Sequence, residues 1–175
     1  MKFCSECGTA LEDKYLEKEG MIPYCLHCGQ FRFPTFNTAV SIIVLNETED
    51  KTLLIKQYGK DDYILVAGYI NKGESAEHAV CRELHEEVGM EVIKLSFNKS
   101  AYFAKTNTLM LNYSCKVNSE TLRYDKDEVD YAQWLTLSEA RKQIKQHSLA
   151  QEFLEYFCEY RFHTGVFAEE RYIPK

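Results

Sequence analysis

The sequence lacks long hydrophobic runs and has no excess of positive charge. Its longest apolar stretch, residues 39–45 (AVSIIVL), is far shorter than the roughly 20 residues that a helix needs to span a bilayer. The N-terminal sequence MKFCSECG contains no apolar signal core, so we expect a cytoplasmic protein without a membrane partner. The formal net charge of −6 disfavours nonspecific nucleic-acid binding, which requires a cationic surface. A local basic patch is still compatible with this net charge.

The cysteines also do not form the pattern of a disulfide framework. Four of the seven make two Cys-x-x-Cys pairs, and the remaining Cys81, Cys115 and Cys158 are an odd number in apolar surroundings. This distribution favours a metal site together with buried free thiols in a reducing compartment. The hydrophobic fraction of 45% is sufficient for a folded core in one domain of ordinary size plus a small appendage.

The chain changes character near Pro34. Residues 1–33 hold both cysteine pairs and few aliphatic residues, whereas short runs rich in Val, Ile, Tyr and Phe follow. We therefore expect two domains, residues 1–33 and residues 34–175. The expected strands cover residues 39–45, 52–57, 62–67, 92–103, 108–117 and 129–134, and the expected helices cover residues 75–88, 138–146 and 149–161.

The paired cysteines predict a structural zinc site in the first domain. Cys4-x-x-Cys7 and Cys25-x-x-Cys28 each place two thiolates on one tight turn, and two such turns complete a tetrahedral site with no open position. A redox Cys-x-x-Cys motif is the alternative, but two pairs at this spacing disfavour it. Zn²⁺ bound here would hold the fold and take no part in catalysis.

The expected helix at residues 75–88 carries a cluster of acidic side chains. Glu83 and Glu87 are four residues apart and therefore share a helix face, which overlaps the apolar stripe, and Glu86 lies beside them. Carboxylates at the edge of a core repel one another and need a counter-charge, which Arg82 or a divalent cation can supply. A solvated acidic helix is the simpler alternative for such residues considered alone.

The spacing of this stretch resembles the Nudix hydrolase family. The positions that match the Nudix box are Gly68, Glu74, Arg82-Glu83-Leu84, Glu86-Glu87 and Gly89-Met90. The cysteine pairs before the box, Glu128 ahead of Ala132-x-Trp134, and Ser148-Leu149-Ala150 look like the zinc-ribbon-containing NADH pyrophosphatase branch. The signature that follows the box in this branch corresponds to residues 100–110, which agree with it only at the ends. The resemblance implies an α/β/α sandwich with a mixed β-sheet, preceded by a small zinc ribbon, and a homodimer.

The resemblance also implies a catalytic metal site. Glu83 and Glu87 would bind Mg²⁺ or Mn²⁺ directly, Glu86 directly or through water, and the carbonyl of Ala67 would be a further ligand. Glu128 corresponds to a carboxylate that this branch brings from outside the box. It would act as the general base or bind another metal ion, and Glu83 is the competing base.

The remaining site residues are expected to position the substrate or the ligands. Arg82 and Glu74 would hold the loop and the helix in register, as partners of the ligands. Tyr69 would stack on an aromatic ring of the substrate, and Gly68 and Ala150 would belong to the same substrate-binding surface.

Three functions are compatible with these residues. The first is hydrolysis of the pyrophosphate bond in NAD(H), ADP-ribose or a related nucleoside diphosphate derivative. The second is removal of a nucleotide cap from RNA, which the net charge mildly disfavours. The third is a noncatalytic nucleotide sensor whose ribbon binds a partner, which the complete set of three glutamates disfavours.

Overall fold

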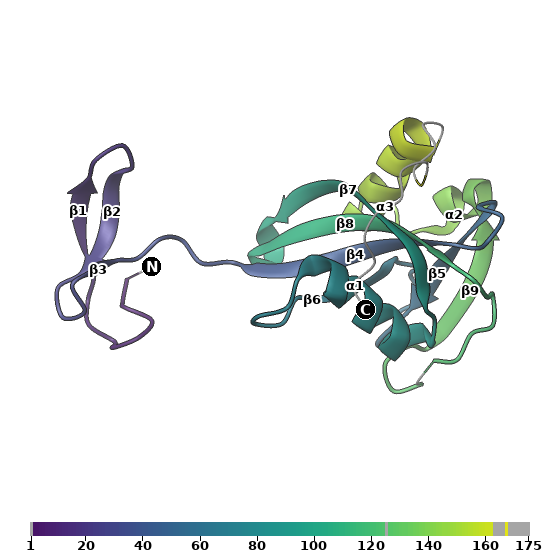
Figure 1. Cartoon of the computed structure of the whole chain (residues 1–175), viewed down its shortest axis with the longest axis horizontal. Helices are drawn as coiled ribbons and strands as arrows, with labels where there is room; N and C mark the ends of the chain where they lie inside the picture. The colour runs from purple at the N-terminus through teal and green to yellow at the C-terminus, as the bar shows by residue number, and fades with distance from the viewer. Residues whose placement is uncertain (1, 125, 163–166, 168–175) are drawn as a thin grey trace. The chain divides into compact units, whose positions relative to one another are not determined.

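The structure is a computed structural model that describes residues 2–124, 126–162 and 167 (Figure 1). Its contacts divide the chain into two compact units, Met1–Phe36 and Asn37–Lys175. Of the tail at residues 163–175, only residue 167 is among those described. Within the described part of the chain, no helix has both the length and the apolarity needed to cross a membrane.

The first unit is a three-stranded antiparallel sheet with the order β1-β2-β3. Its strands are β1 (Glu12–Leu16), β2 (Gly20–Cys25) and β3 (Gln30–Phe31). The ring of Tyr24 meets the ring of Phe31 edge to face, with 4.9 Å between the ring centroids. Most other residues of the unit are exposed, and Cys4 and Cys25 are its buried hydrophobic residues. An apolar core this small is less than a domain usually needs to be stable by itself.

The second unit is built on a mixed six-stranded sheet. Its strands are β4 (Asn37–Leu45), β5 (Lys51–Lys56), β6 (Val66–Tyr69), β7 (Val92–Phe103), β8 (Thr108–Val117) and β9 (Tyr131–Thr136). The order is β7-β8-β4-β5-β9, and β6 pairs with β4 beside this path. Strands β4 and β8 run parallel, whereas the other pairs are antiparallel.

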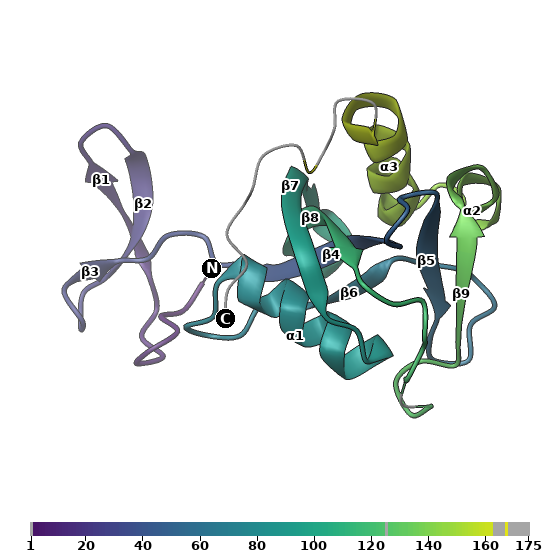
Figure 2. The same ribbon diagram turned by 45° about the vertical axis from the view of Figure 1, so that its right-hand side comes forward.

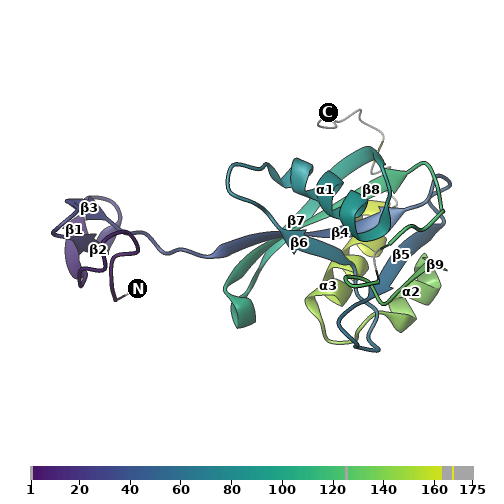
Figure 3. The same ribbon diagram turned by 90° about the horizontal axis from the view of Figure 1, so that it is seen from below.

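Helices cover both faces of this sheet, as Figures 2 and 3 show. Helix α1 (Ala76–Val88) lies on one face, and α2 (Leu137–Gln143) and α3 (Leu149–Tyr156) lie on the other. Strand β4 serves both layers because successive side chains of a strand point to opposite faces. Val40, Ile42 and Val44 pack with α1, while Ile43 and Leu45 pack with α2 and α3. The expected α/β/α sandwich with a mixed sheet is confirmed.

Helix α1 has the ends that its sequence predicts. The side chain of Ser75 accepts a hydrogen bond from the backbone N–H of His78 at 3.2 Å, which caps the first turn. Gly89 ends the helix with a φ of 67°, and a Cβ there would lie 2.6 Å from the carbonyl oxygen of Arg123. The left-handed backbone and this close approach both require glycine.

The strand expected at residues 62–67 is wrong in extent. Only Val66–Tyr69 forms a strand, β6, because the preceding residues change partners along the chain. Ile64 makes an isolated bridge to Ile55, and Tyr63 makes one to Ile144. The side-chain pattern of residues 62–67 indicates extended backbone, but it does not identify the strand with which that backbone pairs.

The two C-terminal helices are shorter than expected. Helix α2 stops at Gln143 because Ile144 is extended and Lys145 donates its backbone N–H to the carbonyl of Tyr63. Helix α3 stops at Tyr156, and Phe157–Arg161 continues as a π-helix, η2. A short 3-10 turn, η1 (Ala104–Thr106), which the sequence did not indicate, joins β7 to β8.

Candidate active site

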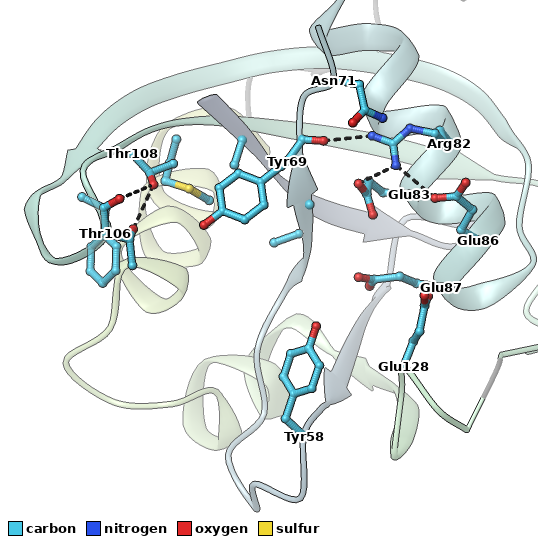
Figure 4. Close-up of a pocket in the computed structure, with 15 residues that line it drawn as sticks. Tyr58, Tyr69, Asn71, Arg82, Glu83, Glu86, Glu87, Thr106, Thr108 and Glu128 are labelled. Carbon is cyan, nitrogen blue, oxygen red and sulfur yellow. Dashed lines mark hydrogen bonds and ion pairs between the residues drawn. The ribbon is translucent and has the colours of Figure 1, made fainter. Parts of the chain in front are cut away.

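The acidic face of α1 borders an open cavity of about 520 Å³ (Figure 4). The predicted site residues that line it are Ala67, Gly68, Tyr69, Arg82, Glu83, Glu86, Glu87 and Glu128. They come from the end of β6, from α1 and from the segment before β9. Residues that the sequence did not single out complete the lining: Ala39, Tyr58, Asn71, Phe103, Thr106, Thr108 and Met110. The fold therefore gathers one polar wall and one partly apolar wall around a shared space.

Gly68 leaves room for the Glu83 carboxylate beside β6. A Cβ at position 68 would lie 1.9 Å from the carboxylate carbon of Glu83, so a side chain there would displace this carboxylate. Strand β6 pairs with β4 through this residue, with Gly68 opposite Val40, and α1 packs against both strands. The missing side chain at Gly68 thus lets the Glu83 carboxylate lie against the backbone that follows Ala67.

Arg82 links the loop before α1 to the acidic side chains. Its guanidinium donates hydrogen bonds of 2.8 and 3.0 Å to the two carboxylate oxygens of Glu74, and one of 2.9 Å to the carbonyl of Tyr69. It also donates to Glu83 at 2.7 Å and to Glu86 at 3.0 Å. These bonds use the planar fork of arginine in a way that lysine cannot reproduce.

Glu74 stabilises the loop before α1 and does not line the cavity. Its carboxylate accepts the backbone N–H of Asn71 at 2.9 Å, and the bond from Arg82 is the main cause that lowers its pKa. Arg82 and Glu74 thus connect the loop between β6 and α1 to the helix, and their predicted role in positioning the metal ligands stays a prediction.

Glu87 is the most deeply buried carboxylate of the group, with a relative exposure of 6%. Oε1 accepts a 3.1 Å hydrogen bond from the side chain of Gln57, whereas Oε2 is buried and has no hydrogen-bond partner among the described residues. The pKa of Glu87 is raised to about 7, mainly by burial and in addition by the nearby charges of Glu83 and Glu128, while the hydrogen bond from Gln57 opposes the rise. Burial also raises the pKa of Glu83, against the effect of Arg82.

This arrangement suits a divalent cation. A buried carboxylate oxygen that has no hydrogen-bond partner among the described residues, in a group that neighbouring carboxylates also affect, is costly. A cation with a preference for oxygen ligands would remove this cost. The glutamates are not already gathered about one point. In the part of the chain that the structure describes, the four paired cysteines are the one group of three or more candidate ligands whose atoms all lie within 4.8 Å of one another. A cation at α1 would therefore compete with Arg82 for Glu83 and Glu86.

Gln57 belongs to this site although sequence reasoning missed it. It follows β5, is 7% exposed, and is separated by 30 residues from the glutamate that it contacts. One signal in the sequence could have indicated it: Gln57 is a polar residue close after the apolar run of β5, whose residues 52–55 are buried.

Ala150 lies outside the cavity described above. It lines a neighbouring, mostly apolar pocket of about 280 Å³ beneath α3. The two pockets share Ala67, Phe103 and Met110 in their linings. A substrate that extends past these three residues would reach Ala150, so its predicted role in substrate binding stays a prediction.

The four paired cysteines come together in the first unit. The Sγ atoms of Cys7 and Cys25 are 3.5 Å apart, and those of Cys4 and Cys28 are 3.9 Å apart. Both knuckles have the same turn: the residue after each second cysteine, Gly8 or Gly29, donates its N–H at 2.9 Å to the carbonyl of the first cysteine. Both glycines have positive φ, of 73° and 66°. This geometry is compatible with a zinc ribbon.

Arg32 adds charge to the cysteine cluster. Its Nε donates a 3.2 Å hydrogen bond to Cys4 Sγ, and this contact is the main cause that lowers the pKa of Cys4 to about 6. The other end of the guanidinium pairs with Glu6 at 2.8 Å. A thiol with a lowered pKa is more readily available as a thiolate ligand.

Comparison with known proteins identifies the second unit. Residues 35–157 match the NUDIX domain family. The chain is 30% identical over 158 residues to the NAD-capped RNA hydrolase NudC of Pseudomonas aeruginosa, covering 89% of this chain and 55% of that protein. It is 24% identical over 155 residues to the NAD-capped RNA hydrolase NudC of Vibrio parahaemolyticus, covering 89% and 58%. The chain thus spans little more than half the length of these curated relatives.

Solved structures show the same fold. A NUDIX hydrolase from Nitrosomonas europaea matches with a TM-score of 0.68 at 20% identity, covering 94% of each chain. The NUDIX domain of Shewanella oneidensis NrtR, solved in complex with ADP ribose, matches with a TM-score of 0.62 at 16% identity, covering 78% of this chain and 92% of that one. The matched family, the mixed sheet between helices and the acidic helix beside a cavity agree, and the chain belongs to the Nudix family.

Proposed function

We propose that this protein is a metal-dependent pyrophosphohydrolase that cleaves a nucleoside diphosphate linked to a second group, such as NAD(H) or ADP-ribose. The observation that carries the proposal is the buried, unpartnered Oε2 of Glu87, which lies with Glu83 and Glu86 along one cavity wall. Cleavage of a pyrophosphate requires neutralisation of the phosphate charges, and these three carboxylates are the ligands suited to the cation that does so. The names of the NudC relatives support the NAD-related substrate class.

Some residues around the cavity would bind the cation, and others would bind the substrate. Mg²⁺ or Mn²⁺, held by Glu83, Glu86, Glu87 and the carbonyl of Ala67, would supply positive charge to the phosphates. Glu128 is exposed beside Glu87, so it can accept a proton from an attacking water or serve as a further ligand (Figure 4). Tyr69, 57% exposed on the lining, offers its ring to a base.

A substrate panel tests the proposal. Purified protein is incubated with NADH, ADP-ribose, FAD, diadenosine polyphosphates and nucleoside triphosphates, each with Mg²⁺ or Mn²⁺, and mononucleotide release is measured. We expect metal-dependent release of a nucleoside monophosphate from NADH or ADP-ribose. Binding without turnover across the whole panel would instead support the noncatalytic sensor.

Removal of an NAD cap from RNA is a second candidate, because the curated relatives at 24–30% identity carry that activity in their names. The two candidates differ in whether the enzyme binds the RNA chain in addition to the NAD group. An NAD-capped RNA oligonucleotide and free NADH, compared at equal concentration and several salt concentrations, separate them. A decapping enzyme should show a higher kcat/KM for the capped oligonucleotide, with an advantage that falls as salt rises.

Three further assignments complete the proposal. The cysteine cluster would hold one structural Zn²⁺ per chain, which elemental analysis of the reduced protein can measure. The ribbon and the Nudix region would be separate domains, residues 1–33 and residues 34–175. The protein would be a homodimer, and a monomeric mass by light scattering at micromolar concentration would contradict this part.

A further inference from the structure

The turn after β5 contains a tyrosine in a backbone conformation that tyrosine adopts at a cost. Tyr58 has a φ of 57° and the next residue, Gly59, has a φ of 66°, while Lys60 donates its N–H to the carbonyl of Gln57 at 3.2 Å. Two consecutive positive φ angles with this hydrogen bond are the pattern of a type I′ turn. Asn, Asp and Gly are preferred at its first central position, and a bulky ring there is an outlier.

This turn is held firmly against the rest of the domain. The side chain of Gln57 donates to Glu87, and the backbone N–H of Gly59 donates to the carboxylate of Asp130 at 2.7 Å. Asp130 in turn donates its backbone N–H to the carbonyl of Lys56 at 2.9 Å. The turn is thus fixed at one end to α1 and at the other to the segment that carries Glu128.

The ring of Tyr58 adds little to the core. Its relative exposure is 76%, yet it lines the same cavity as Tyr69 and the glutamates. Figure 4 shows it on a different wall of the cavity from Tyr69. Tyr58 follows β5, whereas Tyr69 is the last residue of β6. A residue that strains the backbone and remains exposed at a cavity is explained by a ligand more readily than by the fold.

We propose that Tyr58 is a substrate-binding residue whose ring stacks on a planar ring of the nucleotide, from the wall of the cavity opposite to the loop that follows β6. This inference rests on the proposed function, since it concerns the same cavity and substrate class. Stacking suits the observations, because every nucleobase and the nicotinamide ring have a π face and an exposed tyrosine ring matches it. The fixed turn presents the ring already in place, which reduces the entropy lost on binding.

The test measures binding of three probes, namely AMP, nicotinamide mononucleotide and ribose 5-phosphate, with Mg²⁺ present. Tyr58→Ala should weaken the binding of AMP or of nicotinamide mononucleotide about 10-fold, the size of effect expected when one stacked aromatic is lost. Ribose 5-phosphate, which has no planar ring, should bind as before. Tyr58→Phe should behave as the wild type, because it keeps the ring, and Tyr160→Ala, which removes an exposed tyrosine outside the cavity, should change nothing.

Tyr58→Gly separates a binding role from a structural one. Glycine accepts a positive φ without strain, so the Tm should be at least that of the wild type while the ring-bearing probes bind as weakly as to Tyr58→Ala. A markedly lower Tm would show that Tyr58 supports the fold and would overturn the inference. It would also be overturned if both ring-bearing probes kept their affinity, if ribose 5-phosphate lost as much, or if Tyr58→Phe matched Tyr58→Ala.

The two proposals fail in different ways. If the wild type cleaves NADH and Tyr58→Ala has the same KM and kcat, the inference fails and the proposed function stands. If the wild type binds the ring-bearing probes and Tyr58→Ala weakens them, but no compound in the panel is cleaved, the inference stands and the enzymatic function fails. If no probe binds the wild type and no compound in the panel is cleaved, both fail.

Discussion

Glu87→Gln is the substitution that most directly tests the electrostatics of the acidic helix. The substitution keeps the size of the side chain and an oxygen that can accept the bond from Gln57, but it removes the charge. Burial raises the pKa of Glu87 from an ordinary value of 4.5 to about 7 in the protein without metal. Each pKa unit corresponds to about 1.4 kcal/mol, so the ionised carboxylate costs the folded state about 3 kcal/mol at most.

The sign of the pH dependence follows from this shift. The folded-state pKa lies above the unfolded value, so the folded state holds the proton more tightly. Stability that is present below about pH 4.5 is therefore lost as the pH rises through about 7. In protein kept free of Mg²⁺ and Mn²⁺, we expect Glu87→Gln and the wild type to unfold alike near pH 5. At pH 8 we expect the variant to be more stable by up to about 3 kcal/mol, less the cost of burying the new amide.

Addition of Mn²⁺ should reverse the order at pH 8. The wild type gains stability because the cation binds the folded state alone, whereas the variant gains much less. Turnover of the best substrate should fall by several orders of magnitude, as when a major electrostatic stabiliser is lost. Thermal unfolding at pH 5 and pH 8, with and without Mn²⁺, and product release measure these effects. Glu77→Gln is the control, since its amide oxygen can still accept the hydroxyl of Tyr113. Equal effects of pH and Mn²⁺ on the wild type and on Glu87→Gln would refute the reasoning.

Three other changes have definite expected outcomes. Gly68→Ala should reduce turnover at least 100-fold, because its Cβ displaces the Glu83 carboxylate; normal activity would mean that the position of this carboxylate is not needed for turnover. Arg82→Lys should lower both kcat and the Tm, because lysine cannot make the paired bonds to Glu74, and an unchanged Tm would contradict its role in fixing the loop. Cys25→Ser should release zinc and expose the first unit to proteolysis, while the second unit keeps its own melting transition; retention of one zinc per chain would refute the four-cysteine site.

The features that could be predicted from the sequence are those that depend on near neighbours in the chain. Glu83 and Glu87 share a face because a helix repeats every 3.6 residues, and Ser75 and Gly89 end that helix because of local capping. The two cysteine knuckles follow from a spacing of three residues within each pair. The strands of the mixed sheet follow from runs rich in Val, Ile, Tyr and Phe. The exceptions are β6, whose beginning depends on its partner, and β9, which lies two residues later than the expected 129–134.

Tertiary structure decides which distant residues meet the acidic helix, and of these the sequence indicated Glu128 only through the family resemblance. Gln57 and Tyr58 follow β5, and Glu128 precedes β9; the antiparallel pairing of those two strands brings both segments to the side of Glu87. Ala150 was separated from the main cavity by the position of α3, which no local pattern specifies. The pKa of Glu87 likewise depends on burial by other elements, and burial is a property of the assembled layers. Helix faces, helix ends and tight turns depend on a few neighbouring residues and can be read from the sequence. Which distant side chains meet at a site depends on the order of the strands in the sheet, and the sequence pattern does not specify that order.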